Sequence, residues 1–158
     1  MQLEDQTDEK EVLDKIYRYC VYQDRCRQEV EKKLKTLGAN PLRIPGIIQH
    51  LEAERFLDEA RFANSFVRGK FTYKRWGKNK LTYELRQKGV SEDLIEAALI
   101  EEIDQEHYEI TARKLIERKA RQLNATSIVD VRDKLVRFMQ QKGFEWETIE
   151  LSLREAVL

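Results

Sequence analysis

The stretch 68–88 concentrates residue types that bind macromolecules. It holds eight basic residues against the single acid Glu84, and Phe71, Tyr73 and Trp76 are interleaved with them. Basic and aromatic side chains together are typical of protein interfaces and of platforms for single-stranded nucleic acid, because they combine attraction to anions with flat stacking surfaces. The chemistry that this pattern favours is recognition of a macromolecule through charge and stacking.

The remaining charges are also grouped, although the chain of 158 residues is formally neutral. Residues 89–109 hold eight acids and no Lys or Arg, and residues 110–125 hold five basic residues against Glu117. Salt screens charges beyond about 8–10 Å, so a partner feels each block separately. This alternation favours a partner of mixed charge over a uniform polyanion. The alternative, that the blocks simply pair with one another on the surface, stays open.

No catalytic or metal-binding pattern accompanies these charges. The sequence has no GxSxG, HExxH, GxGxxG or P-loop motif, and Cys20 and Cys26 have neither CxxC spacing nor a neighbouring histidine. His50 and His107 stand alone. We therefore expect a binding or regulatory protein that is not an enzyme and has no cofactor and no metal.

The elements that must position the basic stretch repeat along the chain. Charged residues make up 37% of the sequence and only two prolines occur, which is typical of a helical protein. Three glycines, 51 and 54 residues apart, each follow apolar residues placed eight and four positions earlier. This spacing predicts three helices, each of which carries its apolar residues on one face and ends at the glycine. The three sets are Val30, Leu34, Gly38; Leu81, Leu85, Gly89; and Leu135, Met139, Gly143.

Further apolar-periodic runs before and after each of these segments predict nine helices in all. The fold class is therefore all-α, with three tandem three-helix repeats over 9–54, 55–103 and 104–158 that stack into an elongated, curved body after a disordered tail over 1–8. Expected helix caps are Asp58, Ser91 and Ser127, with Asp24 capping the helix after Cys26. Gly77 is expected in an exposed turn. The sequence shows no membrane span or leader, so we expect a cytoplasmic monomer.

Two segments around this turn resemble a known family. "FLDEARFANSFVRGK" and "GKNKLTYELRQKGV" are similar to the central signature of the regulatory protein RecX family. Departures are Cys26, where the family often has a capping serine, and Lys142 before Gly143, where it usually has arginine. The matching positions are Leu57, Asp58, Arg61, Phe62, Ala63, Phe66, Val67 and Arg68, then Gly77, Lys80, Leu81, Glu84, Leu85, Lys88, Gly89 and Val90.

The resemblance implies a protein that binds the RecA recombinase filament on single-stranded DNA. It further implies modulation, most often inhibition, of the ATPase, strand-exchange and coprotease activities of RecA in DNA repair and recombination. Single-stranded DNA itself would be contacted indirectly or weakly. An alternative is a helical protein that binds single-stranded nucleic acid without RecA. The expected partner-binding residues are Arg61, Arg68, Lys70, Tyr73, Lys74, Arg75, Trp76, Lys78, Lys80 and Lys88.

Overall fold

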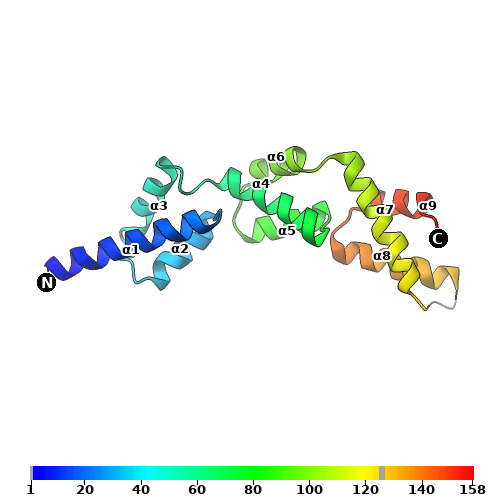
Figure 1. Cartoon of the computed structure of the whole chain (residues 1–158), viewed down its shortest axis with the longest axis horizontal. Coiled ribbons are helices and arrows are strands. Elements are labelled where there is room, and N and C mark those ends of the chain that lie inside the picture. The colour runs from blue at the N-terminus through cyan, green and yellow to red at the C-terminus, as the bar shows by residue number, and fades with distance from the viewer. Residues whose placement is uncertain (1, 125–126) are drawn as a thin grey trace.

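A computed structural model describes residues 2–124 and 127–158, and these residues form helices without a strand (Figure 1). The helices succeed one another in three groups of three, which we call repeats one, two and three. A five-residue π-helical turn, η1 (Lys70–Lys74), extends α4. The bounds are α1 Gln2–Tyr22, α2 Arg27–Thr36 and α3 Ile44–Ala53; α4 Glu59–Gly69, α5 Lys78–Gln87 and α6 Glu92–Glu102; α7 Gln105–Gln122, α8 Ile128–Lys142 and α9 Trp146–Glu155.

The three repeats follow one another along the long axis of the molecule, with the two termini at opposite ends (Figure 1). The all-α class and the tandem three-helix repeats are therefore confirmed. Within the described residues, no helix has the length and apolar character that crossing a membrane requires.

The second helix of each repeat ends as the glycine spacing predicts. Gly38, Gly89 and Gly143 have φ values of 80°, 77° and 92°, in the left-handed region that glycine adopts without a Cβ penalty. The apolar residues eight and four positions before each glycine are fully buried: Val30, Leu34, Leu81, Leu85, Leu135 and Met139. Asp58, Ser91 and Ser127 each accept a backbone N–H at a helix start, as predicted.

Three local features differ from the expectation. Residues 2–8 belong to α1, where the sequence predicts a disordered tail; no glycine or proline interrupts them, so the helix extends backwards. Met1 lies outside the described residues. Asp24 does not cap α2, because Cys26 is the capping residue and its N–H donates to the Glu29 carboxylate. Gly77 is buried and not in an exposed turn.

The buried apolar residues form two separate clusters. Repeat one closes its own core, which extends to Leu57 just before α4. Repeats two and three share a single core that runs without a break from Phe62 to Ile149. Cys26, from the turn between α1 and α2, is fully buried and belongs to this second core. Repeats two and three are thus one packing unit, and repeat one is another.

Repeats two and three are joined at a contact between two backbones. The N–H of Gly77 donates to the carbonyl of Lys142 (2.7 Å), and the N–H of Asn79 donates to that of Gly143 (2.8 Å). A Cβ on Gly77 would lie 2.4 Å from the Gly143 carbonyl, and one on Gly143 would lie 2.2 Å from the Lys80 Cβ. The start of α5 and the end of α8 meet this closely because neither glycine carries a side chain.

An aromatic column supports this joint. The Tyr108 ring packs between Phe71 and Phe144, with ring centres 5.7 and 5.1 Å away. The buried Tyr108 hydroxyl accepts the N–H of Lys78 (2.9 Å) and donates to the Glu145 carboxylate. Burial, and next the hydrogen bond to Glu145, raise the pKa of Tyr108 above its ordinary value. Tyr108 therefore links α5, α7 and the start of α9 as a neutral phenol.

The glycine joint gives a first test. We expect Gly77→Ala to lower the free energy of unfolding by about 1–3 kcal/mol, the usual cost of adding a methyl group to a closely packed site. Gly69→Ala is the matched control, because the residue is helical and no heavy atom outside its chain neighbours and its own helix backbone lies within 4 Å of its Cβ position. That control should raise stability by up to about 1 kcal/mol. Urea unfolding followed by circular dichroism measures the stability of both variants. Equal changes in stability would contradict the claim that the contact at Gly77 requires a glycine.

The aromatic column gives a second test. Tyr108→Phe leaves the Lys78 N–H and the Glu145 carboxylate without their shared partner, so we expect a loss of about 1–3 kcal/mol in unfolding free energy. Tyr83→Phe removes the hydroxyl of a tyrosine that is 58% exposed and should change stability by less than about 0.5 kcal/mol. Thermal unfolding of the two variants side by side makes the comparison. If the Tyr108→Phe protein is as stable as the Tyr83→Phe protein, the Tyr108 hydroxyl does not stabilise the contact between repeats two and three.

Candidate partner-binding surface

The basic stretch folds as an extension of α4 that then turns sharply. After η1, Arg75 adopts a left-handed conformation with φ of 53°. Its N–H donates to the Phe71 carbonyl (3.0 Å), and the N–H of Trp76 donates to that of Lys70 (3.3 Å). Phe71 is buried beneath the turn. A left-handed conformation costs a non-glycine residue about 1–2 kcal/mol, so the burial of Phe71 and these bonds hold the Arg75 side chain at the surface.

Aromatic and basic side chains are interleaved on this turn. The Lys70 and Lys80 ammonium groups lie 5.1 and 4.5 Å from the centre of the Trp76 ring, within cation–π range. The Trp76 ring also packs edge-on against Phe66. Tyr73 is 81% exposed and stands free of this cluster. The turn thus presents two lysines that pack against the Trp76 ring, beside the exposed ring of Tyr73.

Three of the ten expected contact residues form ion pairs inside the chain. Arg61 binds Asp24 (2.7 Å), Arg68 binds Glu102 (2.9 Å) and Lys88 binds Glu29 (3.1 Å). The Arg68 pair, together with the pair between Arg86 and Glu92, joins the basic block to the acidic block. Pairing of the blocks therefore accounts for part of the charge pattern.

The other basic residues of the stretch form no ion pair with a carboxylate of the described residues: Lys70, Lys74, Arg75, Lys78 and Lys80. Of these, Lys78 donates to the Gln105 side-chain oxygen (2.9 Å) and lies 4.6 Å from the centre of the Tyr108 ring. Their positive charge is consequently available to a partner.

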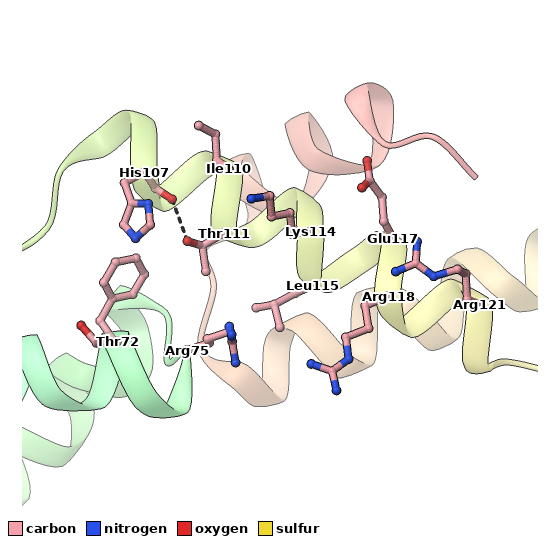
Figure 2. Close-up of a pocket in the computed structure, with 11 residues that line it drawn as sticks. Thr72, Arg75, His107, Ile110, Thr111, Lys114, Leu115, Glu117, Arg118 and Arg121 are labelled. Atoms are coloured by element: carbon pink, nitrogen blue, oxygen red, sulfur yellow. Dashed lines mark hydrogen bonds between the residues drawn. The ribbon is translucent and has the colours of Figure 1, made fainter.

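The structure adds basic residues of repeat three to this surface. A groove of about 420 Å³ separates η1 from α7, with Arg75 on one side and Lys114, Arg118 and Arg121 on the other (Figure 2). The groove floor includes Thr111, whose hydroxyl donates to the His107 carbonyl. An adjoining hollow of about 230 Å³ brings Arg75 and Arg118 together with Lys119 and Lys142. We call these two hollows the basic groove.

The sequence contains a signal for the α7 residues, the second basic block over 110–125, but it gives no indication that they face Arg75. The acid in that block, Glu117, is already bound: it lies 3.9 Å from Arg113 and accepts the N–H of Val157. Among the described residues, no carboxylate pairs with Lys114, Arg118, Arg121 or Lys142. The basic groove is therefore a concentration of unmatched positive charge.

Lys142 reports the electrostatic potential of this surface. Partial burial, and then the nearby cations Lys80, Arg75 and Lys74, lower the pKa of Lys142 below its ordinary value. Its ammonium donates to the Lys74 carbonyl (2.9 Å), which ties α8 to the basic turn. Because like charges crowd there, an anion placed in the basic groove would be stabilised by several cations at once.

Comparison with known proteins shows which family the chain is similar to. Family models for the second and third three-helix domains of RecX match residues 58–99 and 108–151. A regulatory protein RecX of Clostridium botulinum is 35% identical over 84% of this chain, which spans 62% of that relative's length. One from Pelodictyon phaeoclathratiforme is 32% identical over 84% of this chain and 80% of its own.

A solved structure agrees with the sequence relatives. The crystal structure of RecX from Lactobacillus salivarius superposes with a TM-score of 0.83 at 26% identity, covering 94% of this chain and 96% of that one. The sequence relatives are named regulatory proteins. The family signature, the repeats and these matches agree, and the chain belongs to the RecX family.

Proposed function

We propose that this protein binds the RecA recombinase filament assembled on single-stranded DNA and inhibits its ATPase, strand-exchange and coprotease activities, thereby limiting recombination and the SOS response. Family membership supports the RecA assignment. The observation that carries the proposal is the basic groove, with the aromatic turn beside it, on an elongated body of alternating charge. A nucleoprotein filament offers protein surface of mixed sign close to phosphate, which suits such a body.

The proposed contact surface extends from the turn into repeat three. Its centre is the set of unpaired cations and aromatic residues Lys70, Tyr73, Lys74, Arg75, Trp76, Lys78 and Lys80, to which we add Lys114, Arg118, Arg121 and Lys142. Arg61, Arg68 and Lys88 remain in the proposal as flanking positions. We expect smaller effects from them, because each charge is already matched inside the chain.

RecA ATPase on single-stranded DNA, with the protein titrated in, tests the proposal. We expect the unmodified chain to inhibit, and Arg75→Glu with Arg118→Glu to raise the half-inhibitory concentration roughly tenfold, which is a loss of about 1.4 kcal/mol. The control is Lys32→Glu with Arg132→Glu, which makes the same change in net charge at exposed positions outside the groove. Inhibition by the groove variant equal to that by the control would exclude the basic groove from the contact.

A second candidate function is direct binding of single-stranded nucleic acid without RecA. The observation that favours it is the exposed Tyr73 ring beside the basic groove, because a free ring next to cations is the usual platform for an unpaired base.

Mobility shifts of single-stranded DNA, with and without RecA, separate the two candidates. If RecA is the partner, the protein alone should shift DNA weakly and the RecA–DNA complex strongly. If DNA alone is the ligand, binding without RecA should be micromolar or tighter. Engagement of four phosphates would then give a slope of log K against log salt of about −3. In that case Tyr73→Ala should weaken DNA binding. An unchanged affinity would contradict the stacking of a base on the Tyr73 ring.

A further inference from the structure

The two junctions between repeats differ in kind. Repeats two and three share one apolar core and are joined by backbone hydrogen bonds at Gly77. Between repeats one and two, the described residues form no backbone hydrogen bond linking α2 to the end of α5. Among the residues whose burial the structure describes, Cys26 is the only apolar one of repeat one that belongs to the neighbouring core. One small side chain buries little apolar area compared with a continuous core, so this junction resists bending far less.

Polar side chains also make contacts across the first junction, among them Arg27, whose Nε lies 3.9 Å from the Glu59 carboxylate. Asp24 accepts a hydrogen bond from Ser65 and pairs with Arg61, both at 2.7 Å. Although partial burial opposes its ionisation, the hydrogen bonds from Ser65 and Arg61 hold the pKa of Asp24 below its ordinary value. Glu29 pairs with Lys88. The Arg61 and Lys88 side chains are 43% and 31% exposed, so salt and other anions can reach both pairs.

There is also room for movement at this junction. A groove of about 680 Å³ lies between the repeats, lined by Arg27 and Glu52 of repeat one and by Glu59, Ser91 and Leu94 of repeat two. The chain crosses from one repeat to the other once, through residues 54–58, where Arg55 has a φ of 59°. A single connection beside an open groove allows rotation without unfolding either core.

The position equivalent to Gly77 explains the difference. Gly77 precedes the first residue of α5 and stands twelve residues before Gly89; Cys26 precedes the first residue of α2 and stands twelve residues before Gly38. At Gly77, a Cβ would collide with the following repeat. Cys26 carries a Cβ, and at the equivalent helix end no heavy atom other than those of the chain neighbours lies within 4 Å of the Cβ position of Gly89. The side chain of Cys26 thus keeps the two helix ends apart.

We propose that repeat one pivots on a rigid body formed by repeats two and three, and that the Asp24–Arg61 and Glu29–Lys88 pairs act as an ionic latch that sets its angle. A partner anion that paired with Arg61 or Lys88 would release the latch. This release step rests on the proposed function, whereas the pivot and the latch do not.

Distances between spin labels on the full chain test the pivot in the absence of any partner. Labels at Lys32→Cys and Tyr83→Cys span the first junction, and labels at Tyr83→Cys and Arg132→Cys span the second. All three positions are exposed. Burial raises the pKa of the native Cys20 and Cys26 thiols, which keeps them unreactive towards the label.

We expect the 32–83 distance distribution to broaden in 1 M salt and in Asp24→Ala with Lys88→Met, while the 83–132 distribution stays narrow. The control is Arg86→Met, which breaks the ion pair with Glu92 inside repeat two and should leave both distributions unchanged. The proposal would be overturned if the 32–83 and 83–132 distributions were equally narrow and neither salt nor the Asp24→Ala, Lys88→Met variant changed them. The salt arm uses the native latch, so a poorly folded variant does not obscure the result.

The release step has its own readout. Adding the RecA filament on single-stranded DNA to the chain labelled at 32 and 83 should shift that distance. Binding without a shift, in a chain whose distance responds to salt, would reject release by the partner and leave the pivot standing. No binding at all would contradict the proposed function instead.

Discussion

The backbone contact between Gly77 and the end of α8 determines how repeats two and three sit together. Helix ends leave N–H and carbonyl groups without partners, and here the carbonyls of Lys142 and Gly143 meet the free N–H groups at the start of α5. The negative end of the α8 dipole also faces the positive start of α5. A side chain at either glycine would hold the backbones apart, so this arrangement requires both positions to lack a Cβ.

The basic groove follows from that contact. Joining α5 to α8 brings Lys142 beside Lys74, while the column of Phe71, Tyr108 and Phe144 fixes the basic turn against α7. Positive charges from three separate parts of the sequence then converge, although they repel one another, as the lowered pKa of Lys142 indicates. The apolar core and the backbone bonds offset this repulsion, and the uncompensated charge remains available for binding.

The features that the sequence predicts are those decided by near neighbours. The ends at Gly38, Gly89 and Gly143, and the apolar positions before them, follow from spacing within one helix. The pairs of Arg61 with Asp24 and of Arg68 with Glu102 join residues 37 and 34 positions apart, and nothing in the local pattern specifies them. For the same reason, the sequence identifies the basic turn but not the α7 residues that face it. The prediction that Gly77 lies in an exposed turn is wrong, because the residue that covers Gly77 comes from another repeat.

One register position also explains why tandem repeats need not form a uniform rod. Where the residue before the second helix is glycine, two helix ends bond directly and the cores fuse. Where it is Cys26, the side chain enters the neighbouring core and the junction is left to exposed ion pairs, which are weak and sensitive to salt. Stiffness in such a chain is thus set junction by junction, through the presence or absence of a single Cβ. The basic groove lies across the stiff junction, where its cations keep fixed spacings. In the proposed binding mode, the soft junction leaves repeat one free to follow the surface of the partner.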